Sequence, residues 1–321
     1  MNLIGKRVVR GQLRRVSKPV NPSLITGNLL LVVVLWGGNN VGTKWLLTHG
    51  WPPLWTGGIR FLIAGGLLLA VLRLTNWLGR FPPPSRAQRR QLCLRGGLVL
   101  AAYIVVFCWA LKLTTAAHVA LYIGASPVWS LLMEERPQLN WLSARRYAAA
   151  LLALAGVLVL FRPALTGADF NFAGEICGLL ASLAWAVFNV QSRVLARDLS
   201  GLEVAANSMW MSGAMLMPLT VFELWPRGIV LDAAHVSVQS LNIVLGSVVA
   251  YALWNTALRH WPTSRVMLFN NAIPLSTALW AHFCLGEPVT PTFCLAMLLI
   301  VAGVLLGQLD RMKFFRQPDR V

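Results

Sequence analysis

Two short polar stripes in otherwise apolar segments are the residues of this chain best suited to act on a ligand. In the first, Trp36 is followed four residues later by Asn40 and eight residues later by Lys44. In the second, Trp185 is followed by Asn189 at the same spacing. Residues four apart share one face of an α-helix, so each stripe presents an indole beside an amide. That pair suits the flat and the polar parts of an amphipathic organic molecule.

Arg60, His118 and Asn271 are polar residues within or beside apolar runs, and each has two interpretations. Arg60 either extends to the nearest polar boundary or faces the interior, where its guanidinium attracts a carboxylate. His118 is either a hydrogen-bonded packing residue or a proton carrier. Asn271 lies three residues before Pro274, which frees a backbone carbonyl, so its amide either satisfies that carbonyl or lines a break in the helix.

Aromatic and amide side chains also occur together elsewhere. Tyr251 and Asn255 are one turn apart, and Tyr103 lies in another apolar segment. These groups are either core residues or ligand contacts, and the amides of Asn40 and Asn189 either line a cavity or bond neighbouring helices. The candidate substrate-binding residues are Trp36, Asn40, Lys44, Arg60, Tyr103, Trp185, Asn189, Tyr251, Asn255 and Asn271.

No sequence pattern predicts a catalytic residue, a metal site or a cofactor. The five cysteines form no Cys-x-x-Cys pair. The chain contains no His-Glu-x-x-His, no Gly-x-Ser-x-Gly and no glycine-rich phosphate loop. Transport by this chain would therefore be driven by a gradient and not by its own hydrolysis of a nucleotide.

The elements that carry these residues have the composition of a membrane protein. Hydrophobic residues make up 57% of the chain and charged residues 12%, whereas soluble domains average about 45–50% and about 25%. A helix needs about 20 apolar residues to cross a bilayer. The continuous runs predict an all-α polytopic membrane protein with no soluble domain and ten transmembrane helices, at residues 24–47, 54–74, 94–114, 116–134, 144–162, 173–194, 202–222, 236–258, 263–285 and 290–309.

The net charge of +17 is distributed unevenly. With these ten spans, 23 Lys and Arg residues fall on the side of both termini and 5 on the other side. Cytoplasmic segments carry such an excess, so we expect a multi-pass inner-membrane protein with cytoplasmic N- and C-termini. The basic N-terminal tail predicts contact with anionic lipid headgroups, not with nucleic acid.

Several patterns occur twice in the same order. Besides the two stripes, the recurring pairs are Ala110-Leu111-Lys112 with Ala257-Leu258-Arg259, Pro127 with Pro274, and Ala155-Gly156-Val157-Leu158 with Ala302-Gly303-Val304-Leu305. Each copy holds five predicted helices, an odd number, so the second copy enters the membrane in the opposite direction. Inverted repeats of this kind are typical of secondary transporters, whose substrate site lies near the midplane. The predicted units are a tail at 1–23, a first repeat at 24–162, a linker at 163–172, a second repeat at 173–309 and a tail at 310–321.

Over about residues 24–309 the chain resembles the EamA family of the drug/metabolite transporter superfamily. The resemblance rests on motifs in a fixed order: Leu35-Trp36-Gly37 with Asn40 and Lys44, Arg60-Phe61-Leu62, Ser126-Pro127, Ala155-Gly156-Val157 and Gly286-Glu287-Pro288. It implies two inverted five-helix repeats around a central cavity. It also implies export of metabolites, amino acids or toxic compounds from bacteria, without fixing the substrate.

One departure from internal symmetry concerns two carboxylates. Glu287 closes a helix thirteen residues after Pro274, but Glu134 and Glu135 come about two turns earlier in the first repeat. Either the fourth span is short and ends there, or two carboxylates lie inside the membrane, where charge is costly.

The sequence as a whole predicts a secondary transporter that exports or exchanges small metabolites by alternating access. The alternatives are a polytopic membrane enzyme, or a passive channel or receptor. Substrate identity, direction, proton coupling and oligomeric state stay open at this point.

Overall fold

The computed structural model describes residues 22–75, 83–134, 141–166, 171–225, 228–260, 266 and 268–313. Within these ranges the secondary structure is entirely helical. The elements are α1 (Pro22–Thr48), α2 (Pro53–Leu74), α3 (Arg86–Gln91), η1 (Leu92–Gly97), α4 (Leu98–Leu113), α5 (Ala116–Gly124), α6 (Ser126–Glu134), α7 (Trp141–Thr166), α8 (Phe172–Leu195), α9 (Gly201–Leu224), α10 (Ala233–Leu241), η2 (Asn242–Val249), α11 (Ala250–His260), η3 (Leu268–Ala272), α13 (Ile273–Leu285) and α14 (Pro291–Lys313).

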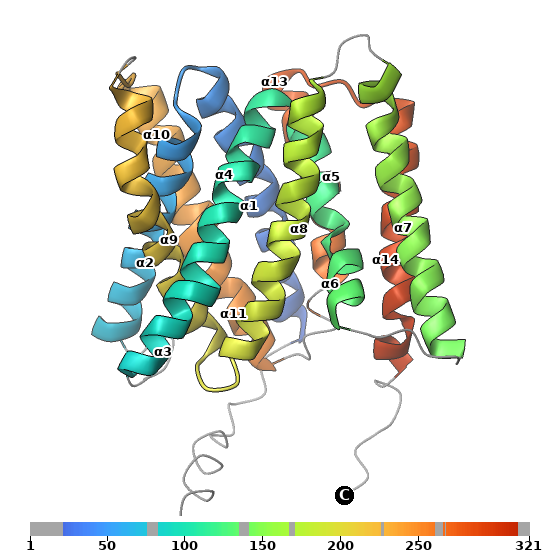
Figure 1. Ribbon diagram of the computed structural model, residues 1–321, viewed down its shortest axis with the longest axis horizontal. Coiled ribbons are helices and arrows are strands. Elements are labelled where there is room, and N and C mark those ends of the chain that lie inside the picture. Colours follow the sequence, from blue (N-terminus) through green and yellow to red (C-terminus); the bar gives the residue numbers. More distant parts are fainter. Residues whose placement is uncertain are drawn as a thin grey trace, which may run out of the picture.

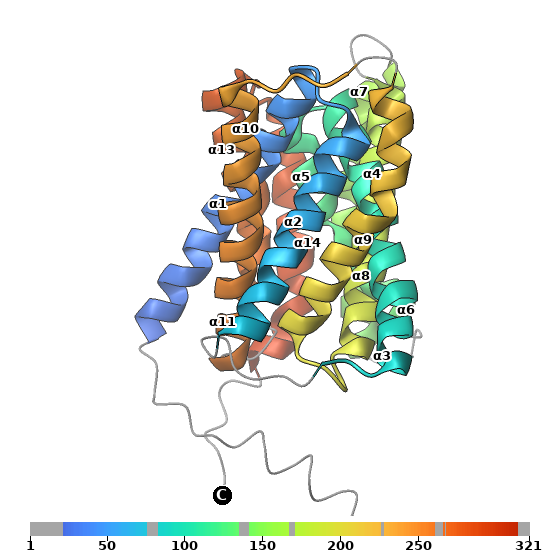
Figure 2. The same cartoon turned by 90° about the vertical axis from the view of Figure 1, so that its left-hand side faces the viewer.

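The helices stand side by side in one bundle, as Figures 1 and 2 show. α1 begins and α14 ends at the same end of the bundle, which we call the terminal face; the opposite end is the distal face (Figure 1). Five described stretches are long and apolar enough to cross a bilayer: Pro22–Thr48, Pro53–Leu74, Arg86–Leu113, Phe172–Leu195 and Ala233–Ala257. The all-helical membrane fold predicted from composition is therefore confirmed.

Several predicted helices are interrupted, and the interruptions occur in pairs. The third and eighth predicted spans each contain a π-helical stretch, η1 and η2. The fourth breaks at Ala125 between α5 and α6, and the ninth contains the 3₁₀ turn η3 before α13. Pro127 and Pro274 follow these last two breaks, and a proline cannot supply the N–H that a continuous helix requires there. Hydropathy alone predicted continuous helices because it does not register such local changes of winding.

Glycines allow helices from the two halves of the sequence to lie almost in backbone contact. A Cβ added to Gly65 of α2 would lie 2.2 Å from the backbone N of Trp210 on α9. Gly213 of α9 faces Leu62 of α2 in the same way, at 2.4 Å from its backbone N. Between α14 and α7, Gly303 approaches the backbone O of Ala149 at 2.6 Å. Close approach of small residues is how membrane helices associate, so these contacts join the halves.

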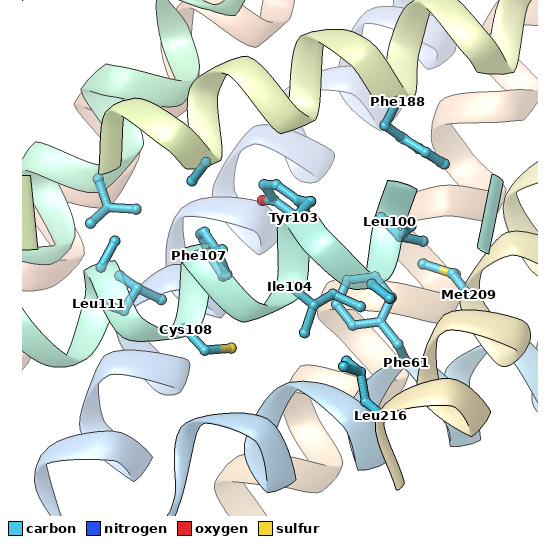
Figure 3. Close-up of a cluster of buried hydrophobic side chains, with 14 of the residues drawn as sticks. Phe61, Leu100, Tyr103, Ile104, Phe107, Cys108, Leu111, Phe188, Met209 and Leu216 are labelled. Carbon is cyan, nitrogen blue, oxygen red and sulfur yellow. The ribbon is translucent and has the colours of Figure 1, made fainter. Parts of the chain in front are cut away.

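α4 lies at the centre of the largest buried apolar cluster (Figure 3). It contributes Leu100, Tyr103, Ile104, Phe107, Cys108 and Leu111, and neighbouring helices add Phe61, Phe188, Met209 and Leu216. Residues of both halves thus share one core, and the candidate site is built at its edge.

Some observed helix ends differ from the predicted boundaries, whereas the end of the fourth span agrees with its prediction. α7 continues to Thr166, into the range predicted as a linker, because Pro163 removes only one hydrogen bond near the end of that helix. α14 reaches Lys313, into the predicted C-terminal tail. α6 ends at Glu134, whereas Glu135 lies outside the described residues.

Candidate functional site

Arg60 of α2 points into the bundle and does not extend to its surface. Only 3% of the residue is exposed. Its Nη1 donates to Oδ1 of Asn39 and to Oγ1 of Thr43, each at 3.0 Å, and both acceptors lie on α1. Its Nε has no hydrogen-bond partner among the described residues. Arg60 therefore faces the interior, and its guanidinium keeps donor capacity for another acceptor; that this acceptor is a carboxylate stays a prediction.

Trp36 forms an aromatic group with residues of the second half. Its Nε1 donates to the backbone O of Gly246 in η2 at 3.1 Å. Its ring lies 5.5 Å from Tyr251, edge to face, and 5.1 Å from Trp254. The acceptor thus lies in a π-helical stretch, a type of distortion common at functional sites. The structure brings together two of the predicted residues, Trp36 and Tyr251.

A second aromatic group joins α4 to α8. The ring of Tyr103 lies 5.2 Å from Phe107 and 5.0 Å from Trp185, and Trp185 lies 5.5 Å from Phe188. Figure 3 shows Tyr103 and Phe107 on α4, with Phe188 on the neighbouring helix. A further predicted pair, Tyr103 and Trp185, is therefore in contact.

Arg60 lies beside the buried cluster that both aromatic groups share. Its guanidinium carbon lies 4.6 Å from the ring centroid of Phe61, and Phe61 belongs with Tyr103 to the cluster against which Tyr251 packs. Aromatic walls with one charged anchor suit a molecule that carries a flat apolar part and an anionic part. Such a site can bind and orient a solute. Among the described residues no group of three potential metal ligands occurs.

The predicted amides divide into three kinds. Asn40 Nδ2 donates to Oγ1 of Thr277 on α13 at 3.1 Å, the helix-bonding alternative. The Nδ2 atoms of Asn189 and Asn255 donate to carbonyls of their own helices at 2.7 Å and 2.8 Å. Asn271 in η3 has an Nδ2 with no partner among the described residues. The four predicted amides therefore have different surroundings and do not form one polar site.

Lys44 binds a different helix from the one that Arg60 binds. Its Nζ donates to the backbone O of Thr114 at 2.6 Å, at the distal end of α4. Asn39, which binds Arg60, was missed by sequence reasoning because it lies outside the indole-and-amide spacing. Glu175 was also missed, although a carboxylate in an apolar run is itself a signal of function. It is fully buried, and Oε2 accepts from the Tyr122 hydroxyl at 2.6 Å.

Comparison with known proteins identifies a family of transporters. The model of the EamA-like transporter family matches the chain twice, at residues 25–162 and 172–307. A probable amino-acid metabolite efflux pump of Escherichia coli K12 is 25% identical over 293 residues, which cover 87% of this chain and 92% of the relative. Transporter YwfM of Bacillus subtilis is 26% identical over 294 residues, covering 87% and 91%.

A solved crystal structure shares the fold. It is 22% identical, covers 90% of this chain and 99% of its own, and superposes with a TM-score of 0.59. The relatives are named as transporters and efflux pumps and not as enzymes. Because the family model matches most of its length, the chain is a multi-pass membrane transporter that belongs to the EamA-like transporter family.

Proposed function

We propose that the protein is an inner-membrane secondary transporter that exports or exchanges small carboxylate-bearing solutes by alternating access. The buried guanidinium of Arg60 carries this proposal, because its Nε has no partner among the described residues and it lies beside the cluster that Tyr103 and Tyr251 share. An amino acid with an apolar side chain offers the matching chemistry, a carboxylate for Arg60 and a flat or branched body for the aromatic rings. The name of the Escherichia coli relative supports the same class.

Alternating access is proposed from the duplication of the chain. The two family matches support two repeats, and five helices in each would invert the second repeat. Two such halves can exchange roles, and a cavity open to one side then opens to the other. The uneven distribution of Lys and Arg supports placing the terminal face in the cytoplasm.

Counterflow in proteoliposomes tests the proposal. Purified protein is reconstituted into vesicles that contain unlabelled phenylalanine, and the entry of labelled phenylalanine is followed. The same measurement is made with phenylethylamine, the analogue that lacks the carboxylate. The wild-type protein should show saturable counterflow of phenylalanine and discriminate against the amine. The Arg60→Gln variant should lose about 1.5–3 kcal/mol of discrimination, because it removes a charge-assisted hydrogen bond from a buried site.

The matched control is Arg95→Gln, which removes an exposed arginine at the terminal face. It should transport like the wild-type protein. Counterflow that does not saturate would favour the channel alternative. An Arg60→Gln variant with unchanged discrimination would remove Arg60 from the binding site.

A further inference from the structure

The side chain of Asn39 lies between Arg60 and the second half of the chain. Its Oδ1 accepts a hydrogen bond from Nη1 of Arg60 at 3.0 Å. On its other side, a Cβ added to Gly246 of η2 would lie 2.7 Å from both Cβ and Oδ1 of Asn39. Gly246 is also the residue whose backbone O accepts from Trp36. Asn39 therefore contacts the buried guanidinium and the π-helical stretch η2 at once, in a space that a larger residue in place of Gly246 would fill.

The hydrogen bond from Arg60 fixes which way the amide of Asn39 points. A guanidinium has donors and no acceptor, so only the amide oxygen can face it. The amide nitrogen Nδ2 then points elsewhere, with both of its hydrogens available. Nδ2 has no hydrogen-bond partner among the described residues, and Asn39 is only half-buried. The site therefore has a second unpaired donor besides Nε of Arg60.

Thr43 contacts the same guanidinium but has no free donor. Its Oγ1 also accepts from Nη1 of Arg60 at 3.0 Å. Its hydroxyl hydrogen, however, is donated to the backbone O of Asn39, one turn earlier on α1, at 2.8 Å. Nδ2 of Asn242, from the second half, lies 3.5 Å from the same Oγ1. Thr43 therefore helps to hold Arg60 in place, whereas Asn39 holds it and keeps a donor of its own.

We propose that Asn39 is a substrate-binding residue, whose Nδ2 forms with the guanidinium of Arg60 a clamp for the carboxylate of the transported solute. A carboxylate has two oxygens that each accept hydrogen bonds, so two donors fix its orientation as well as its position. Trp36 lies one turn before Asn39 on α1, which puts the rings of Trp36 and Tyr251 within reach of the apolar part of a bound amino acid. This inference rests on the proposed binding of carboxylates by Arg60.

Competition during counterflow tests the clamp. Unlabelled phenylalanine and phenylethylamine each compete with labelled phenylalanine, and the ratio of the phenylethylamine to the phenylalanine concentration that halves its entry measures discrimination for the carboxylate. Asn39→Ala should lower this ratio by about tenfold, because it removes a hydrogen bond to a charged group. Thr43→Val also removes one acceptor of Nη1 but no free donor, so it should change the ratio much less. The difference between the two variants isolates the contribution of Nδ2.

Two further variants act on the same residue in other ways. Asn39→Asp keeps an acceptor for Arg60, removes the N–H and adds a negative charge, so phenylethylamine should then compete at least as well as phenylalanine. Gly246→Ala displaces Asn39 from the opposite side, so it should lower the ratio in the wild-type protein but add little to Asn39→Ala. The matched control is Gly38→Ala on α1, whose Cβ would lie 3.6 Å from the nearest atoms, on Trp280, and which should keep the wild-type ratio.

A binding measurement covers variants that fold but do not transport. The rise in Tm of the purified protein in detergent, on addition of phenylalanine or of phenylethylamine, reports the same discrimination without any transport. Loss of discrimination in Arg60→Gln but not in Asn39→Ala overturns the clamp and leaves the proposed function standing. Equal losses in Asn39→Ala and Thr43→Val also overturn the clamp, because Asn39 would then only hold Arg60 in place. A wild-type protein that does not distinguish the two compounds overturns the proposed function and the clamp together.

Discussion

Two adjacent glycines on α2 allow a sharp test of how closely the halves approach each other. A Cβ at Gly65 would lie 2.2 Å from the backbone N of Trp210 and 2.8 Å from its Cα, so α9 itself would have to move. A Cβ at Gly66 would meet nothing within 4 Å. Overpacking lowers the free energy of unfolding by about 1–3 kcal/mol, and a clash with backbone atoms falls at the upper end of this range because the backbone cannot move aside easily. Replacing a helical glycine by alanine gains about 1 kcal/mol where space allows.

Gly65→Ala should therefore lower the free energy of unfolding by about 2 kcal/mol, whereas Gly66→Ala should leave it unchanged or raise it by up to about 1 kcal/mol. The assay is the apparent Tm of the two purified variants in the same detergent, followed by tryptophan fluorescence. With 321 residues, Gly65→Ala should melt about 3 °C below the wild-type protein. Equal Tm values for the two variants would contradict the close packing of α2 on α9.

Two further predictions concern single contacts. Asn40→Ala and Thr277→Ala should each lower the free energy of unfolding by about 1 kcal/mol. Because one hydrogen bond of 3.1 Å between these residues links α1 to α13, the double variant should lose less stability than the sum of the two single variants. Additive losses in Tm would refute the coupling. The pKa of Asp232 lies below its ordinary value, first because its carboxylate accepts from the backbone N–H of His235 and then from the His235 ring. Because this pKa is lowered in the folded state, the cap stabilises the protein above the ordinary pKa of an aspartate, about 4, and the stabilisation is lost as the pH falls through the folded-state value. Asp232→Asn should therefore melt below the wild-type protein at pH 7, and the difference should shrink in acid. A difference in Tm that does not depend on pH would contradict the cap.

Hydropathy and spacing were enough to predict the helical segments of this chain, because a membrane helix needs a long apolar run whatever it packs against. The same information could not predict η1, η2 or the break at Ala125. These distortions depend on which neighbour satisfies the freed backbone groups, as Trp36 does for Gly246. Local spacing carries no information about such distant partners.

The sequence predicted which types of residue occur near the site, but not how their side chains are arranged. The sequence left the direction of Arg60 open, since its acceptors Asn39 and Thr43 lie on another helix. Asn40 lies on the predicted face of α1, but its partner Thr277 is 237 residues away, so helical periodicity could not assign it to packing. Glu175 was detectable in principle, because a carboxylate within an apolar run is itself a signal of function. Its hydrogen-bond donors were not predictable, because only the folded bundle brings them together.

Sided labelling of Asn189→Cys tests alternating access most directly. Asn189 is half-buried and, within the described part of the chain, its Nδ2 bonds to its own helix, so a cysteine there should be tolerated. In a background without native cysteines, an impermeant thiol reagent should reach this position from either face of the membrane, phenylalanine should slow both reactions, and labelled protein should no longer exchange. Reaction from one face alone under every condition, or full exchange by labelled protein, would contradict a site between the halves that opens alternately to the two sides.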